Sequence, residues 1–313
     1  MKSNNNTLYN DKDIPIKEDI MLKYLAKKHS NIGSKTLKRN KDKLGKRIVV
    51  IGLFIFFSTI FISSSFEISN WFKDNKNTSE ITKDIEEIVN VEEITSDENV
   101  ELINTPEEEP EPESDYWYYI KFPLISVDFN ELAKKNSDTV AWIKVNNTNI
   151  NYPVVQTNDN NYYLTRSYDK TWNDAGWVFM DYRNSSNLND RNTIIYAHSR
   201  LDKTMFGSLS KVLKSSWYKN KDNHIINLST PNENSLWQIF SVYKIEEETY
   251  YITTDFNDDE AYLEFLNTLK NRSKYNFEVT LNSNDSIITL STCYSDTERT
   301  VVHAKKIKKS SRS

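Results

Sequence analysis

The pattern of apolar and polar positions divides the chain into four segments. Residues 1–47 are polar and rich in Lys, Asn and Asp, whereas Ile48–Phe66 contains no charged residue. Residues 67–115 are polar and acidic, and from residue 116 onward short β-branched and aromatic runs alternate with Asn, Asp, Ser and Gly. The pattern predicts a basic tail, a transmembrane helix, a disordered linker and a folded domain over 116–313.

Eight runs in the last segment have the composition of β-strands, which are rich in β-branched and aromatic residues and bounded by turn residues. The predicted strands are Val140–Val145, Ile150–Gln156, Gly176–Tyr182, Thr193–His198, His224–Leu228, Leu236–Ile245, Ser286–Thr292 and Thr300–Ile307. Many short strands with regular turn signals are typical of a barrel or a sandwich. The domain is therefore expected to be mainly β.

Three helices are expected among these strands. Asp258–Lys270 begins with acidic residues and carries its apolar residues at helical spacing. Val127–Lys135 has the pattern of a short helix before the first strand, and Thr204–Leu213 is a weaker helical stretch.

The charge-free segment Ile48–Phe66 has the length of a membrane span. At about 1.5 Å per residue, a helix of this length roughly spans a hydrocarbon core of about 30 Å. The basic run Lys35–Arg47 precedes it, so the positive-inside rule predicts a single-pass cell-membrane protein with a cytoplasmic N-terminus and an extracellular domain. A cleaved signal peptide is the alternative, which Ser63–Ser65 leaves open. The region before the segment is far longer than the basic n-region of a signal peptide, and no A-x-A-like cleavage site follows the segment.

The linker over 67–115 ends in the acidic run Glu107–Glu113. Such a sequence has too little apolar surface to offset the entropy lost on ordering, and its like charges extend it. We expect a passive stalk that holds the domain away from the membrane.

Composition argues against several classes of function. The net charge of −5 at pH 7 is mild and does not indicate a nucleic-acid partner. Glycine occurs only five times, and there is no Gly-rich phosphate loop. The histidines and the single cysteine show no C-x-x-C or H-x-x-x-H spacing, so neither a metal nor another cofactor is expected.

Cys293 stands where an apolar strand meets the polar, turn-like stretch 294–298. A lone cysteine is often a small buried apolar residue, but its place at the strand end favours an accessible nucleophile. Arg299 opens the next strand, and a hairpin would return it beside Cys293. Its guanidinium could stabilise an oxyanion, although it could also be an ordinary charge at a strand edge.

A nucleophilic thiol needs a proton partner. Of the four histidines, His29 lies in the cytoplasmic tail and His224 begins a strand among Lys and Asn, where we expect it to be solvated. His303 shares strand parity with Arg299 and faces either the site or the core. His198 ends an apolar strand at a polar loop, as Cys293 does, and is therefore preferred.

These residues resemble a known family. Thr289–Cys293 reads TLSTC, which is similar to the TLxTC signature of sortases, and an arginine follows on the next strand. The IIYAHS segment around His198, the MFGSL segment after it and the RTVVHAK ending resemble class B sortases in particular. The resemblance covers roughly Val127–Ile307.

The resemblance implies a closed eight-stranded β-barrel with an N-terminal helix and a helix inserted before the cysteine strand. It implies that Cys293 cleaves the Thr–Gly or Thr–Asn bond of a C-terminal sorting motif on secreted proteins through a thioester. An amino group of peptidoglycan, or of its lipid-linked precursor, would then take over the acyl group. In this reading His198 is the general acid and base, and Arg299 stabilises the oxyanion or orients the substrate. The implied substrate-groove residues are Ser291, Thr292, Tyr196, Asn160, Leu164, Tyr251 and Ile252.

Two other functions remain open. A pilin-polymerising sortase would use a pilin lysine as its acceptor, although no lid-like insertion precedes the domain. A catalytically silent adhesion or signalling ectodomain would have the same membrane stalk, but the position of Cys293 at a strand end argues against it. The stretch from Cys293 to Arg299 is shorter than in many class B sortases, and Ala197 stands where glycine is common.

Overall fold

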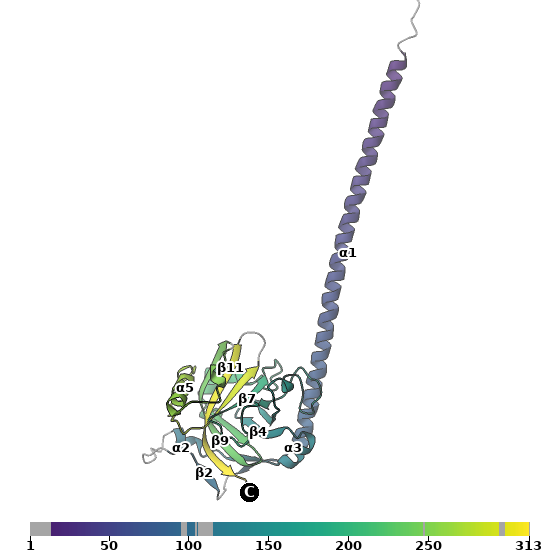
Figure 1. Ribbon diagram of the computed structural model, residues 1–313. Coiled ribbons are helices and arrows are strands. Elements are labelled where there is room, and N and C mark those ends of the chain that lie inside the picture. The colour runs from purple at the N-terminus through teal and green to yellow at the C-terminus, as the bar shows by residue number, and fades with distance from the viewer. Residues whose placement is uncertain are drawn as a thin grey trace, which may run out of the picture. The chain divides into compact units, whose positions relative to one another are not determined.

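The computed structural model forms two compact units, Met1–Asn70 and Trp71–Ser313 (Figure 1). The structure describes residues 14–94, 99–103, 105, 115–246, 248–293 and 298–312.

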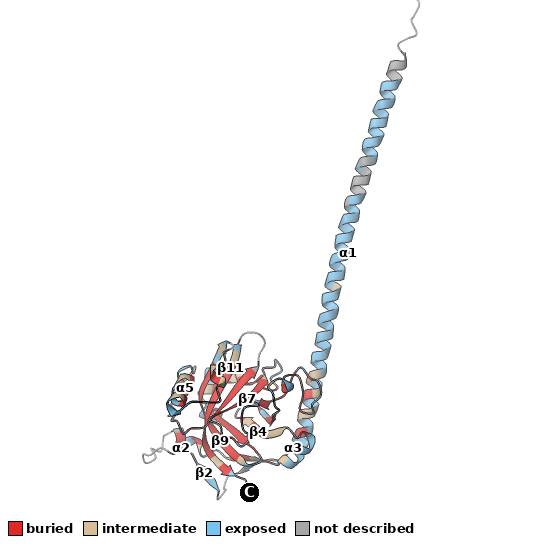
Figure 2. Ribbon diagram, viewed as in Figure 1, coloured by how far each residue is buried: buried red, intermediate tan, exposed pale blue. Residues whose placement is uncertain are grey.

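Helix α1 (Ile14–Ile88) contains the charge-free segment. Nearly every residue of 48–66 is exposed (Figure 2). Within the described part of the chain, Lys43–Ile88 is the one stretch of helix that is long and apolar enough to cross a bilayer. An apolar helix without a protein partner is stable in lipid rather than in water. The observation agrees with the predicted membrane span.

Eight strands of the second unit form a closed barrel (Figure 1). They are β4 (Thr139–Val145), β5 (Asn151–Val155), β6 (Phe179–Met180), β7 (Asn192–His198), β8 (Ile225–Ser229), β9 (Glu233–Glu246), β10 (Ile287–Cys293) and β11 (Glu298–Ser311). Their order is β10-β7-β6-β5-β4-β8-β9-β11, and pairing of β10 with β11 closes the ring. The eight-stranded barrel is confirmed, and each predicted strand lies where a strand is found, although only Phe179–Met180 of the predicted Gly176–Tyr182 is a strand.

Barrel strands are buried on both faces because loops and helices cover the outside. Along β7 every residue from Asn192 to Ala197 is buried (Figure 2). The core of the unit includes large side chains such as Trp142 and Phe240, each 1% exposed. This explains why the strands read as nearly continuous apolar runs rather than as alternating ones.

Helix α5 (Asp259–Asn271) lies between β9 and β10 and confirms the helix predicted before the cysteine strand. Its N-cap is Asp258, whose Oδ1 accepts from the Ala261 amide at 2.7 Å. Helix α3 (Phe129–Lys135) confirms the helix predicted before the first barrel strand. The remaining short elements are α2 (Asp115–Tyr119), α4 (Ser215–Tyr218), η1 (Tyr162–Leu164), η3 (Lys221–Asn223) and η4 (Tyr250–Ile252).

The helix predicted over 204–213 is wrong for its first half. Only η2 (Leu209–Leu213) is helical, as a 3₁₀ turn. Lys203 and Met205 have φ of 68° and 49°, which a right-handed helix does not allow.

The linker prediction for 67–115 is wrong over the described part of that stretch. Helix α1 continues to Ile88 and packs on the barrel, where Ile85 is 2% exposed. Strand β1 (Val91–Ile94) pairs with β3 (Leu124–Val127), and β2 (Val100–Leu102) joins β11. Residues 95–98, 104 and 106–114 lie outside the described residues. The folded unit therefore begins at Trp71 rather than at residue 116.

Candidate active site

Cys293 and His198 end two neighbouring strands that run in the same direction. Strands β7 and β10 are parallel, and the Cα of Cys293 pairs with the Cα of His198. Parallel neighbours that end in register bring their last residues to the same edge of the sheet. The same register pairs Ser291 with Tyr196 and Thr292 with Ala197.

Arg299 reaches this edge from the other side of β10. Strands β10 and β11 are antiparallel, and their last pair is Ser291 with Val301. Cys293 and Arg299 each lie two residues beyond that pair. The Thr292 hydroxyl accepts from the Thr300 amide at 2.9 Å, which extends the contact between the strands toward Cys293. The Arg299 residue is half-buried, and the turn-like stretch 294–297 lies outside the described residues.

The imidazole of His198 is held by the backbone of Leu164 and lies close to Gly176. Its Nε2 lies 2.8 Å from the carbonyl oxygen of Leu164. A carbonyl only accepts, so Nε2 carries a hydrogen. A Cβ on Gly176 would lie 2.9 Å from Cδ2 of His198 and 2.8 Å from the same Leu164 carbonyl oxygen. Glycine is needed at this position for two reasons. Its φ of 59° is a conformation that other residues rarely adopt, and a Cβ would collide with the imidazole of His198.

His303 is fully buried, at 0% exposed. Its Nε2 lies 2.8 Å from the Tyr243 hydroxyl and its Nδ1 2.9 Å from the Thr289 hydroxyl. Burial lowers the pKa of His303 to about 3, so the ring stays neutral near pH 7. A neutral ring with both nitrogens bonded is poorly suited to carrying protons.

The expectation that His224 is solvated is wrong. It is 4% exposed and stacks on Tyr218, with ring centroids 5.6 Å apart. Its Nδ1 lies 2.7 Å from the Tyr119 hydroxyl and its Nε2 2.8 Å from the Tyr218 carbonyl oxygen. The Lys and Asn residues next to His224 in the sequence indicated a solvated side chain. The aromatic residues around its ring could not be recognised from that stretch, because other segments of the chain supply part of them.

Two predicted groove residues meet at the same barrel edge. The Tyr251 hydroxyl lies 3.0 Å from the Ser291 hydroxyl, and both are buried. The Asn192 side chain supports the turn that carries Tyr251, because its Nδ2 donates to the Thr253 carbonyl oxygen at 2.9 Å. Element η4 is thus fixed to the barrel next to β10.

Two other predicted groove residues share a partner that the sequence did not reveal. The Tyr196 hydroxyl donates to Asp181 at 2.9 Å, and the Asn160 amide donates to the same oxygen at 3.0 Å. Asp181 directly follows β6 and is 0% exposed. Its position directly after an apolar run could have marked it as a candidate site residue. Its partners could not be recognised in the same way, because they lie 15 and 21 residues away in the sequence.

Each predicted site residue can now be placed. Cys293, His198, Ser291, Thr292 and Tyr196 lie on β7 and β10 in one register. Leu164, Asn160, Tyr251 and Ile252 lie in η1, η4 and the loop before η1. Across the described ranges, no three His, Cys, Asp or Glu side chains are placed to hold a metal ion.

The family model that matches this chain is that of the sortase domain, over residues 143–307. Sortase B of Listeria monocytogenes is 32% identical over 265 residues, which cover 83% of this chain and 92% of that protein. Sortase B of Staphylococcus aureus is 39% identical over 182 residues, which cover 57% of this chain and 74% of that protein.

Solved structures give the same similarity. A Bacillus anthracis protein described as similar to sortase B superposes with a TM-score of 0.59 at 34% identity, covering 78% of this chain and 99% of that one. The S. aureus sortase B–substrate complex superposes with a TM-score of 0.55 at 40% identity, covering 57% of this chain and 84% of that one. The match to the family model includes the strands that carry Cys293, His198 and Arg299.

Proposed function

This chain belongs to the sortase family and is a cysteine transpeptidase of the sortase B type, and from this premise we propose the roles of its residues. Cys293 is the nucleophile, His198 is the general acid and base, and Arg299 stabilises the oxyanion. The observation that carries this proposal is the pairing of Cys293 with His198 at the ends of two parallel strands.

The reaction has two halves. The thiolate of Cys293 attacks the threonine carbonyl carbon of a sorting motif, the carbon–nitrogen bond breaks, and His198 gives a proton to the leaving amine. This leaves a thioester on Cys293. An acceptor amine then attacks the thioester, His198 takes the proton that the amine loses, and Cys293 leaves as a thiolate as the new amide forms.

Arg299 acts on the charge that develops in both halves. Each attack places a negative charge on the carbonyl oxygen, and a guanidinium is a fixed and permanently charged set of donors. Arg299 and Cys293 each lie two residues beyond the last pair of β10 and β11, and this supports the role.

The substrate and acceptor classes follow from the same proposal. The substrate is a secreted protein with a C-terminal sorting signal, cleaved at a Thr–Gly or Thr–Asn bond. The acceptor is an amino group of peptidoglycan or of its lipid-linked precursor. The groove that holds the sorting motif is lined by Ser291, Thr292, Tyr196, Asn160, Leu164, Tyr251 and Ile252.

The enzyme is proposed to work at the outer face of the cell membrane. Segment 48–66 anchors it, the basic residues before this segment keep the N-terminus in the cytoplasm, and the barrel lies outside. The exposed apolar surface of this part of α1 supports the anchoring.

Cleavage of a sorting-signal peptide tests the catalytic roles. We expect Cys293→Ala and His198→Ala to lose cleavage while their thermal unfolding stays near that of the unaltered chain. His303→Gln is the matched control, because it alters a buried histidine and should retain cleavage. An active His198→Ala chain together with a folded but inactive His303→Gln chain would reverse the assignment.

A further inference from the structure

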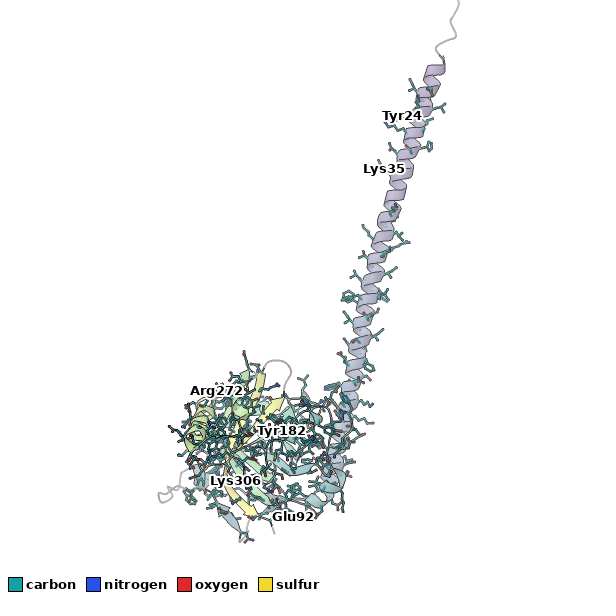
Figure 3. The ribbon with its side chains drawn as sticks, in the orientation of Figure 1. Tyr24, Lys35, Glu92, Tyr182, Arg272 and Lys306 are labelled. Atoms are coloured by element: carbon teal, nitrogen blue, oxygen red, sulfur yellow. The ribbon has the colours of Figure 1, made fainter. Side chains whose placement is uncertain are left out.

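Asp181 is a buried carboxylate whose side-chain partners lie on β7, in the loop before η1 and two residues further along its own loop. Its Oδ2 accepts from the Tyr196 hydroxyl on β7 at 2.9 Å and from Nδ2 of Asn160 at 3.0 Å. Asn160 is held at both ends of its amide, because its Oδ1 also accepts from the Tyr182 backbone at 3.0 Å. The exposed Tyr182 is labelled in Figure 3.

Arg183 extends this arrangement to η4. Its Nε donates to Oδ1 of Asp181 at 2.8 Å and its Nη2 donates to Oδ2 at 2.7 Å. The same Nη2 donates to the carbonyl oxygen of Ile252 at 3.0 Å. A bidentate pair fixes both the distance and the plane of the guanidinium. Ile252 is therefore placed by Asp181 through a single intervening side chain.

The carboxylate is ionised in this setting. Burial by itself would raise the pKa of Asp181, but hydrogen bonds from Arg183 and Tyr196 outweigh it and hold the pKa below its usual range. A buried charge with this many donors has little freedom to move, because every alternative place leaves it unpaired.

We propose that Asp181 is a positioning residue, whose carboxylate fixes three groove residues before the peptide arrives. This proposal rests on the proposed function, since Asn160, Tyr196 and Ile252 belong to the proposed groove. Asp181 acts through these residues and does not itself touch the peptide. A groove ordered in advance binds more tightly, because the peptide does not have to order it.

Asp181→Asn tests the proposal with almost no change in shape. The amide has one acceptor oxygen, so its NH2 group must face donors of Arg183, Tyr196 or Asn160 whichever way it turns. The loss of hydrogen bonds to the ionised carboxylate should lower kcat/KM for a sorting-signal peptide roughly ten- to a hundred-fold, mainly through a higher KM. Alkylation of Cys293 by iodoacetamide should stay within about twofold, because the thiol and its proton partner are unaltered.

Asp285→Asn is the matched control. Asp285 is also a buried carboxylate, 3.3 Å from its partner Lys305, but it precedes β10 at the end away from Cys293. Both variants should melt at lower temperature, while only Asp181→Asn should raise KM. Equal KM changes in the two variants would show a general loss of stability and overturn the proposal.

Two further measurements keep the proposal open to refutation. Arg183→Lys keeps the charge and loses the bidentate geometry, so it should raise KM less than Asp181→Asn and in the same direction; an unchanged KM would overturn the proposal. Hydrogen exchange needs no substrate. Amides of Tyr182 and of 250–253 should exchange faster in Asp181→Asn and not in Asp285→Asn. If the unaltered chain cleaves no such peptide, the proposed function fails, and exchange alone decides whether Asp181 orders these segments.

Discussion

The last turns of α1 should be essential to the stability of the barrel unit. Ile85 is 2% exposed and Val89, which directly follows the helix, is 9% exposed, and both belong to the apolar core of this unit. Burying one such side chain contributes about 1.5–3 kcal/mol, so the pair contributes roughly 3–6 kcal/mol. A native domain is stable by about 5–15 kcal/mol, so removing this helix should take away a large share of the total.

Hydrogen bonds to α1 add to this cost. Asn173 is 0% exposed, and its Nδ2 donates to Oδ1 of Asn77 at 2.8 Å and to Oγ1 of Thr78 at 3.1 Å. Without the helix this buried amide would lose these acceptors, at a cost of about 1–3 kcal/mol unless water replaces them. The Arg200 side chain, which follows His198 by two residues, also donates to Asn75.

Urea unfolding measures the effect directly. A chain that begins at Trp71 should be more stable than one that begins at residue 90 by at least about 3 kcal/mol. Within the longer chain, Ile85→Ala should cost about 2–5 kcal/mol. The control Phe72→Ala lies on the same helix at 63% exposed and should change stability by less than about 0.5 kcal/mol. Equal unfolding free energies for the two chains, or equal costs for the two substitutions, would refute the reasoning.

Two further predictions concern His303 and Arg299. The His303 pKa is lowered to about 3 in the folded chain, so only the unfolded chain takes up this proton as pH falls below about 6.5, and stability falls with it. The loss between pH 6.5 and pH 5 should be about 1.5 kcal/mol, and urea unfolding of His303→Gln should show a shallower pH dependence; an identical slope would contradict this. Arg299→Lys should lower kcat for peptide cleavage roughly 10²–10³-fold at unchanged thermal stability, because lysine keeps the charge but not the fork of donors; a near-normal kcat would remove Arg299 from the mechanism.

The barrel could be predicted because its strands carry their own signals. Segment 193–198 is apolar up to its last residue, and polar residues bound it on both sides. Such runs are typical of strands that are buried on both faces. The proximity of Cys293 and His198 could also be predicted, because both residues stand where an apolar strand ends and polar sequence begins.

The packed part of α1 could not be predicted from composition. Ile81, Ile85 and Ile88 have helical spacing and lie on the core, but the acidic residues around them indicated a disordered linker. Whether such a face is buried depends on a partner surface, which here is assembled from distant segments. The environment of His224 was missed for the same reason.

The support of the groove was also beyond sequence reasoning. Asp181 contacts Tyr196, and Arg183 contacts Ile252, which lies 69 residues further along the chain. Nothing in the local pattern distinguishes these charges from solvated ones. Only the closed barrel brings the end of β6, β7 and η4 together.

Mass spectrometry of the acyl-enzyme tests the central claim most directly. The full chain is mixed with a sorting-signal peptide, and the reaction is quenched in acid and digested. The mass of the fragment that contains Cys293 is then measured. We predict that this fragment gains the mass of the acyl part of the peptide and loses it on treatment with hydroxylamine, as a thioester does. The adduct should be absent when iodoacetamide has first blocked the thiol. Peptide cleavage that continues after the thiol is blocked, or in the Cys293→Ala chain, would contradict the account.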